Sequence, residues 1–400
     1  MVTWREGRVL AVRSRRPGLV EYAVRLPPVP GSPERTVTAL GYAELVGEAS
    51  PGDRVLLTTD ALDLGLGTGG YAFVAAVPDR LSDASSPGST SGSSPGSTSG
   101  SSPRSPSGPA RVVKGRYTPW QVPVAAVEDH RSPHHGTLRD ADDLSGLPVV
   151  AVELHSALPA VLAGIRERGA GLRVSYVMTD GAALPLALSD TVHGLRECGW
   201  LAGVVTTGQA FGGDLEAVTV HSGLLAARHA LGADVVVVGP GPGGVGTGTR
   251  WGFTGVAAGE AVNAVGALGG RAVAALRVSG ADPRPRHQGL SHHSRTAYGR
   301  VALAPADLPV PLLLGDAADA GAGDGCGTEV GALLRRQVAE LVAHAGARLT
   351  AHDIEVDGLT EALRACPVPL STMGRGLAQD PAAFLAAAAA GRHAATLPRT

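Results

Sequence analysis

The chain has 400 residues, of which 44% are hydrophobic, so it can bury a large core and form two or three domains. Its net charge of −2 gives no electrostatic reason to expect nucleic acid or a membrane surface as a partner. The cysteines show no paired spacing, and no uncharged apolar run reaches the roughly 18 residues of a membrane span. A disulfide framework, a zinc knuckle and a transmembrane helix are therefore not indicated, and we expect a cytoplasmic protein.

Five short segments near the N-terminus are typical of β-strands. They alternate in polarity or are rich in β-branched residues, and glycine, proline and aspartate separate them. This spacing predicts a small all-β barrel or sandwich. The segments are Gly7–Ser14, Val20–Leu26, Arg35–Leu40, Asp53–Thr59 and Tyr71–Val77. Between the last two, the glycine-rich stretch Leu62–Tyr71 is either a tight hairpin or a loop that allows close approach.

The composition changes sharply at residues 83–109, where SSPGSTSG occurs twice in tandem. This Ser/Pro/Gly segment has nothing to bury, so we predict that it is disordered. Because Arg111–Thr118 looks like a strand again, we interpret the segment as an insertion within a β domain of residues 1–127. Residues 128–147 are polar and turn-rich and are expected to be a linker whose histidines are solvated.

Residues 148–400 are predicted to form the ligand-binding domain, because apolar strands alternate there with helical patterns. This alternation is typical of an α/β fold with a doubly wound, mostly parallel sheet covered on both faces. The predicted strands are Pro148–Leu154, Leu172–Thr179, Gly203–Thr207, Ala233–Val238, Arg271–Ser279, Val301–Ala304, Val310–Leu314, Arg348–Asp353 and Val368–Ser371. The predicted helices are Ala157–Arg168, Leu186–Cys198, Leu215–Leu231, Glu260–Leu268, Thr328–Ala345, Leu359–Ala365 and Pro381–His393.

Polar residues follow six of these strands, at the end where such sheets bind ligands. We therefore expect their side chains to meet in one site. In chain order they are Glu153 and His155, then Asp180, then Gln209 and Asp214, then the glycine-rich segment Gly239–Gly252, then Asp282–His293, and finally Ser371, Thr372 and Arg375.

The glycine-rich segment predicts an anion cradle made of backbone N–H groups and hydroxyls. Its late helix and missing lysine argue against a dinucleotide fingerprint and a P-loop. The alternative is that the glycines serve only tight turns. The substrate-binding residues expected here are Gly241, Gly243, Gly246, Thr247, Gly248 and Thr249, together with Gln209, Asp214, Arg286 and Arg375 from neighbouring loops.

The segment Asp282–Thr296 contains three arginines and three histidines. Arginine can clamp phosphate or carboxylate, and histidine can relay protons or bind metal. We expect His287, His292 and His293 to act with Asp180 in acid–base chemistry. Metal ligation and a solvated polar loop are alternatives for the histidines. Helix capping is the alternative for Asp180, a buried hydrogen-bonded side chain for His155, and a surface salt bridge for Arg375.

The segments DLGLGTGGY, YVMTDGAALP, TTGQAFGGDLEAV, GPGPGGVGTGT, RPRHQGLSHHSRTA and STMGR together resemble a bacterial family catalogued as domain of unknown function 3866. The resemblance covers the chain apart from the Ser/Pro/Gly segment. It implies that Asp180, the glycine-rich segment and His287–His293 belong to one site, and it implies no particular reaction.

The leading hypothesis is an enzyme acting on a small anionic or phosphorylated metabolite. The alternatives are a non-catalytic sensor of a metabolite or nucleotide and a purely structural subunit. The sequence identifies no cofactor and no particular metal, it predicts neither nucleic acid nor membrane as partner, and it leaves a homo-oligomer open.

Overall fold

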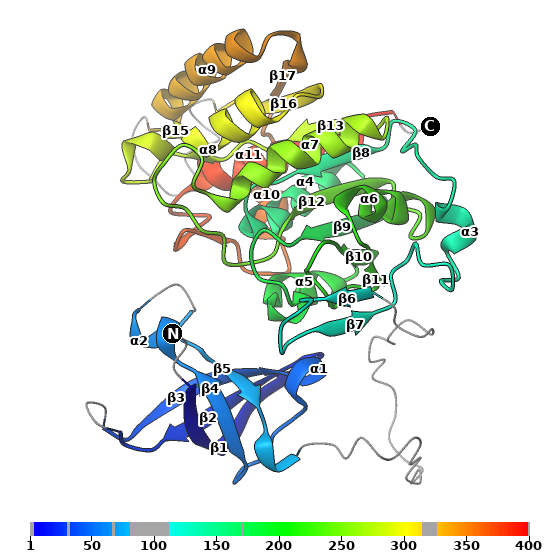
Figure 1. Cartoon of the computed structure of the whole chain (residues 1–400). Coiled ribbons are helices and arrows are strands. Elements are labelled where there is room, and N and C mark those ends of the chain that lie inside the picture. The colour runs from blue at the N-terminus through cyan, green and yellow to red at the C-terminus, as the bar shows by residue number, and fades with distance from the viewer. Residues whose placement is uncertain are drawn as a thin grey trace. The chain divides into compact units, whose positions relative to one another are not determined.

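The computed structural model describes residues 4–29, 33–65, 69–80, 112–169, 171–313 and 326–398. The chain forms two compact units, Met1–Ser107 and Gly108–Thr400 (Figure 1). The predicted disordered segment, 83–109, lies outside the described residues.

Five strands of the first unit close into a barrel, drawn in blue in Figure 1. Their order is β1-β2-β3-β5-β4, and β3 runs parallel to β5 while the other recorded pairs are antiparallel. Closure leaves no unpaired sheet edge, and alternate residues such as Val24, Leu26, Val55 and Leu57 fill the interior. The predicted all-β fold and its five strands are confirmed. The elements are β1 (Trp4–Arg16), β2 (Leu19–Leu26), β3 (Arg35–Tyr42), α1 (Ala43–Val46), β4 (Arg54–Thr58), α2 (Asp60–Asp63) and β5 (Ala72–Ala76).

Eight parallel strands form the central sheet of the second unit, in the order β11-β10-β9-β12-β8-β13-β16-β17. The middle strands are buried along their whole length, because helices cover both faces, and β12 accordingly reads VVVVGP. The predicted parallel α/β sheet is confirmed. The strands are β8 (Pro148–Ala151), β9 (Val174–Thr179), β10 (Gly203–Thr206), β11 (Leu215–Glu216), β12 (Val235–Pro240), β13 (Arg271–Ala274), β16 (Ala306–Pro311) and β17 (Leu349–Ile354).

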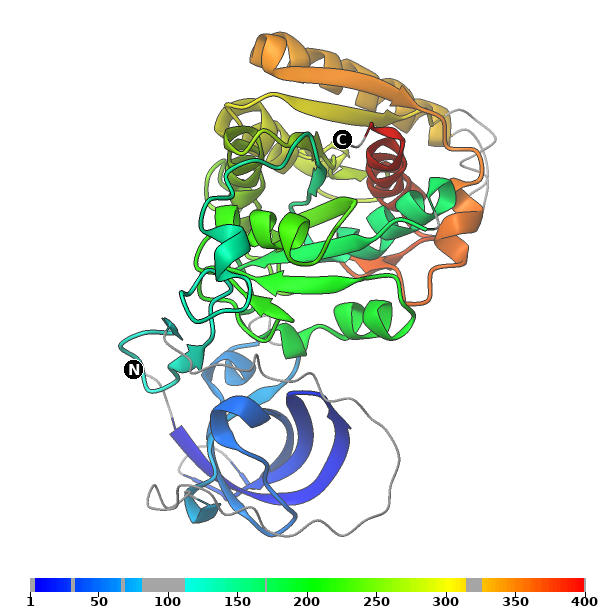
Figure 2. The same cartoon turned by 90° about the vertical axis from the view of Figure 1, so that its right-hand side faces the viewer.

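The helices pack in two layers, one on each face of the sheet (Figures 1 and 2). In one layer α4 packs against α11 and α10, and in the other α6 and α7 pack against each other and against the strands. The helices are α4 (Leu158–Arg168), α5 (Asp190–Glu197), α6 (Val220–His229), α7 (Ala257–Ala267), α9 (Cys326–Ala345), α10 (Leu359–Arg364) and α11 (Pro381–Thr396). A short helix α8 (His292–Thr296) continues into a π-helical turn, Ala297–Val301.

The sheet has a topological switch point between β8 and β12. The chain leaves β8 through α4 and reaches β9 on the β12 side, whereas it leaves β12 through α7 and reaches β13 on the opposite side of β8. The two connections diverge, so their loops open a crevice beyond the carboxyl ends of these two strands.

Three predicted elements are wrong in position or type. Val301–Ala304 is not a strand, because its backbone groups are hydrogen-bonded to the Asn263 side chain instead of to a neighbouring strand. Asn263 Nδ2 donates to Val301 O, and Oδ1 accepts from Leu303 N and Ala304 N. Val368–Ser371 contains Pro369, which cannot donate to a ladder, and pairing there is limited to a small hairpin of β18 (Ser371–Thr372) and β19 (Arg375–Gly376).

The helix predicted at Leu215–Leu231 begins later, at Val220. A capping box between Thr219 and Ser222 fixes this start, and the preceding residues form the edge strand β11.

Residues directly before β8 belong to the second unit. β6 (Val112–Lys114) pairs with β7 (Val122–Val124), and a short helix α3 (His135–Leu138) follows. Leu144 and Leu147, expected in a polar linker, are fully buried in the core of this unit. The domain boundary at residue 127 stays a prediction, while the compact unit itself begins at Gly108.

Candidate functional site

A cavity of about 520 Å³ lies at the switch point. Its walls come from the residues after β8, the residues after β12, the first turn of α5 and the segment 368–373. This volume is within the range of roughly 300–1,000 Å³ that is usual for small-molecule sites. A narrow extension of about 40 Å³ continues toward Arg277 and Asp282, and both spaces share Glu153, Leu154, Ser156 and Met373.

Glu153 stands where the cavity and its extension meet. Its side chain is buried, its Oε1 accepts a short hydrogen bond from the hydroxyl of Ser294, and its Oε2 is buried without a hydrogen-bond partner among the described residues. Burial raises the pKa of Glu153 to about 7, although the Ser294 hydrogen bond and the charge of Arg277 oppose that rise. The carboxyl group can therefore exist in both protonation states near neutral pH.

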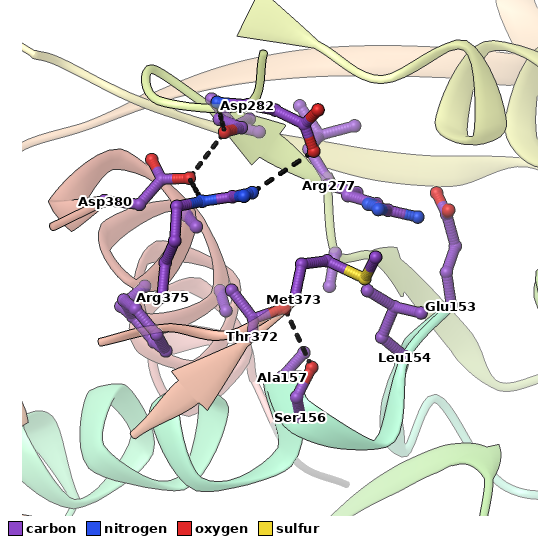
Figure 3. A pocket seen from close by; sticks show the side chains of 17 residues that line it. Glu153, Leu154, Ser156, Ala157, Arg277, Asp282, Thr372, Met373, Arg375 and Asp380 are labelled. Carbon is purple, nitrogen blue, oxygen red and sulfur yellow. Dashed lines mark hydrogen bonds and ion pairs between the residues drawn. The ribbon is translucent and has the colours of Figure 1, made fainter. Parts of the chain in front are cut away.

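Arg277 connects Glu153 to the histidine-rich loop. Its guanidinium points toward Glu153 (Figure 3), and its Nη1 donates to Nδ1 of His293 at 2.9 Å. Its backbone N–H donates to the Ser294 hydroxyl, which in turn donates to Glu153. Burial lowers the pKa of Arg277, but arginine stays charged because its starting value is so high. A half-buried cation therefore lies beside the titrating carboxyl.

The far wall of the extension is an ion-pair network, of which Figure 3 shows the pairs of Arg375 with Asp282 and Asp380 as dashed lines. Asp282 accepts from Arg284 through both oxygens and pairs with Arg375 at 3.2 Å, and Arg375 also pairs with Asp380 at 3.2 Å. The hydrogen bonds from Arg284 hold the pKa of Asp282 well below its usual range. Arg375 thus lies at the site, but two carboxylates already balance its charge. Arg375 is therefore part of an ion-pair network at the wall of the site, and its expected role in anion binding stays a prediction.

The three predicted histidines form one cluster. His287 ends a turn at Pro285–His287, and His292 and His293 begin α8 after the N-cap Ser291. Their ring centroids are 4.3–5.0 Å apart. Burial and the neighbouring arginines lower the pKa of His287 and of His293 to about 3, so both rings are neutral. Neutral imidazoles can accept protons or ligate metal.

The glycine-rich segment passes beside this cluster. Phe253 stacks on the His293 ring with centroids 3.7 Å apart, and a Cβ on Gly246 would lie 3.6 Å from the same ring. Gly248 has a φ of +80°, and a Cβ there would lie 3.6 Å from Arg286. Only glycine fits at Gly241, where a Cβ would be 2.7 Å from Ala183 O. The segment therefore lies in ordinary van der Waals reach of the histidine-rich loop, and its close approach at Gly241 is to the loop after β9.

The predicted hydroxyls of the segment bond within it. Thr247 Oγ1 donates to Gly252 O at 3.0 Å, and Thr249 Oγ1 accepts from Gly252 N at 3.1 Å. In contrast, the N–H groups of Gly243 and Gly244, on the cavity wall, donate no hydrogen bond within the described part of the chain. Gly243 and Gly244 therefore present exposed backbone donors on the cavity wall.

Three predicted site residues stabilise loops and are not among the cavity-lining residues. Asp180 is exposed, and its Oδ2 accepts from Gln209 N at 2.9 Å. The Gln209 side chain accepts from Gly115 N, and Asp214 pairs with Arg196 and accepts from Val204 N. The loops after β9 and β10 therefore contribute these residues to local structure, whereas the loops after β8, β12 and β13 and the segment 371–375 meet at the cavity.

His155 lines the cavity but is fully hydrogen-bonded, as in the structural alternative. Its Nε2 lies 2.7 Å from the Ser189 hydroxyl, and its Nδ1 lies 3.2 Å from both Pro240 O and the Tyr176 hydroxyl. Burial lowers the pKa of His155 to about 4, which keeps the ring neutral. It holds the loop after β8 against the end of β12.

Sequence reasoning missed Arg277, Ser294 and Ser189. Arg277 fell inside the predicted strand Arg271–Ser279, but β13 ends at Ala274 and leaves the arginine beyond the strand. A lone arginine in the apolar run AVAALRVS was the available signal. Ser294 and Ser189 gave none, because serine is common at the start of helices.

Among the described residues, two groups of side chains have the composition of a metal-ligand set: His287, His292 and His293, which adjoin Arg277 and do not line the cavity, and Asp307, His352 and His393 on β16, β17 and α11. In the second group the carboxylate lies 3.1 Å from His352 Nε2 and 2.9 Å from His393 Nε2, and Arg271 also donates to it.

Residues 38–391 match the family described as "Protein of unknown function (DUF3866)", so the chain belongs to that family. The match extends from β3 of the barrel to α11. No curated protein sequence and no solved structure matches the chain. Among the described residues, no helix has the length and apolar character needed to span a membrane.

Proposed function

We propose that this member of a family of unknown function is an enzyme that acts on a small anionic metabolite bound at the switch point, with Glu153 as the proton-transferring group. The proposal rests on one observation above the others. A buried carboxyl oxygen on a cavity wall has no hydrogen-bond partner among the described residues, and the guanidinium of the half-buried Arg277 lies beside its carboxyl group.

An anionic ligand is favoured by the donors around the cavity. Arg277 supplies a charge, and Gly243 and Gly244 supply backbone N–H groups at the end of a strand, an arrangement typical of phosphate and carboxylate binding. The cavity volume of about 520 Å³ suits a ligand of metabolite size. Phosphorylated compounds are therefore the first class to test.

Acid–base chemistry is favoured by the protonation state of Glu153. A general acid or base works best when its pKa lies close to the working pH, and burial brings the pKa of this carboxyl to about 7. Ser294 fixes one oxygen and leaves the other to meet a substrate proton. The charge of Arg277 would stabilise negative charge that develops on a bound substrate.

A ligand screen with matched variants tests this proposal. Inorganic phosphate and a panel of phosphorylated metabolites are added to the full chain, and the thermal unfolding midpoint is recorded. A ligand at 100 times its Kd stabilises the folded chain by about 2.7 kcal/mol, so binding raises the midpoint. Arg277→Gln should abolish this rise. Arg166→Gln should leave it unchanged, because Arg166 is a half-buried residue of α4 that lies over the Trp200 ring and does not line the cavity.

Turnover separates an enzyme from a sensor. Any metabolite that binds is incubated with the full chain and its conversion is followed by mass spectrometry. Glu153→Gln should keep binding and lower the rate by about 100-fold or more. Binding without conversion by the wild-type chain would favour the sensor alternative, and a panel without any midpoint shift would contradict the proposed site.

A further inference from the structure

The cluster of His287, His292 and His293 is more compact than its hydrogen bonds explain. One ring nitrogen from each of the three lies within 4.8 Å of the other two. Nδ1 of His287 bonds to the Ser291 hydroxyl at 2.8 Å, and Nδ1 of His293 accepts from Arg277. Nε2 is therefore the ring nitrogen that His287 and His293 each have available for a ligand.

His292 supplies the independent observation. Its Nε2 is buried and has no hydrogen-bond partner among the described residues. A buried nitrogen without a partner is unfavourable, and native proteins rarely leave one in that state. One ring nitrogen of His292 lies within 4.8 Å of a ring nitrogen of each of the other two histidines, so an ion that accepts lone pairs could bind all three rings.

The second histidine group shows what hydrogen bonding alone produces. His352 and His393 each lie within hydrogen-bond distance of a different oxygen of Asp307, so ordinary ion pairing accounts for their proximity. Among the described residues, no ion pair or hydrogen bond to a carboxylate is recorded for the rings of the first cluster. Phe253 stacks on His293, Ser291 bonds to His287, and Arg277 bonds to His293. The three rings are thus held beside one another without a carboxylate to account for their proximity.

We propose that His287, His292 and His293 are the ligands of one divalent transition-metal ion, of which Zn²⁺ is the best match. Three imidazoles with a fourth position open are a ligand set of catalytic zinc sites. Magnesium and calcium prefer oxygen ligands, which these three side chains do not offer.

The hydrogen bond from Arg277 sets a condition on metal binding at His293. Because Arg277 donates to Nδ1 of His293, the proton of the neutral ring is on Nε2. A neutral imidazole coordinates metal through its unprotonated nitrogen. Binding at Nε2 therefore moves the ring proton to Nδ1, and the hydrogen bond from Arg277 to that atom is then lost.

The test uses the full chain, stripped with a chelator and titrated with ZnCl₂ or CoCl₂. We expect one ion per chain by elemental analysis and a visible absorption band of the cobalt form typical of low-coordinate nitrogen ligands. His292→Ala should weaken zinc binding by about 100-fold or more, since even outer-shell changes weaken metal sites 10–100-fold. His352→Ala, in the hydrogen-bonded histidine group, should bind zinc like the wild-type chain.

The proposal is overturned if the wild-type chain takes up no stoichiometric zinc or cobalt, or if His292→Ala binds as tightly as wild type. Circular dichroism checks that the variant is folded. If it is not, His287→Gln is compared in its place, and wild-type affinity in that variant has the same negative meaning. These readouts require no substrate, so they can succeed when the anionic-metabolite screen fails, and they can fail when it succeeds.

Discussion

The structure around Glu153 disfavours the ionised form of its carboxyl group. Burial raises the pKa of its carboxyl to about 7, and neither the Ser294 hydrogen bond nor Arg277 fully compensates. In the unfolded chain the same group has a pKa near 4.5. The folded state therefore binds this proton more tightly than the unfolded state, and the resulting stability is complete below pH 4.5 and is lost as the pH rises toward 7.

Glu153→Gln isolates this effect, because glutamine resembles the neutral acid. The quantity to compare is the difference in free energy of unfolding, wild type minus variant. This difference should fall by about 3 kcal/mol between pH 4.5 and pH 7.5. Urea unfolding at several pH values, with chelator present throughout, measures it. A difference that stays constant with pH would mean that Glu153 titrates normally and is not suited to acid–base chemistry.

At the level of elements, the contact between α4 and α11 depends on two glycines. A Cβ on Gly164 would lie 1.9 Å from Ala388 O, and a Cβ on Gly391 would lie 1.9 Å from Val161 O. Neither position has a positive φ, so the requirement is space rather than backbone conformation. The alanine-rich sequence of α11 permits the same close approach. This contact holds α4 in place, and α4 directly follows the loop after β8.

Gly164→Ala should therefore destabilise the chain although alanine is the better helix former. Propensity favours the change by up to about 1 kcal/mol, whereas separating two tightly packed helices costs about 1–3 kcal/mol or more. Urea unfolding gives the difference. Gly136→Ala in α3, where nothing lies within 4 Å of the added Cβ, is the control and should be neutral or stabilising. Equal effects of the two substitutions would contradict this account of the helix contact.

The elements that sequence predicted correctly are those with a strong local pattern. The barrel strands alternate in polarity, and β12 is a run of β-branched residues between turn signals. Val301–Ala304 has an equally apolar pattern, but Asn263, 38 residues before Val301, takes up its backbone groups. No local pattern contains that information, so the position of the strand could not be corrected from sequence.

The candidate site was predictable to the extent that it follows from topology. Residues after β8, β12 and β13 meet because strand ends of a parallel sheet share an edge, and the three histidines lie within seven residues of one another. Asp180 follows a strand of the same sheet, yet it is exposed and bonds to Gln209 N. Which strand ends flank the switch point depends on strand order, and strand order is not encoded in the spacing of the segments.

At the scale of the whole molecule, the only lysine in the sequence marks where the second unit begins. Lys114 is buried and donates to Glu216 at 2.6 Å and to the carbonyl oxygens of Thr206 and Ala210. Glu216 is buried as well, and its backbone carbonyl accepts from Val127 N. The segment that contains β6 and β7 thus completes the edge of the parallel sheet at β11 and neutralises a charge inside it.

Two truncated chains test this boundary. A chain of residues 108–400 keeps the Lys114–Glu216 pair and should unfold cooperatively in urea. A chain of residues 128–400, cut at the boundary expected from sequence, leaves Glu216 buried without its cation and should be less stable by about 3–5 kcal/mol. Adding Glu216→Gln to the shorter chain should recover part of this loss, because it removes the unpaired charge but does not restore the lost strand contacts. Equal stability of the two truncated chains would place residues 108–127 outside the second unit.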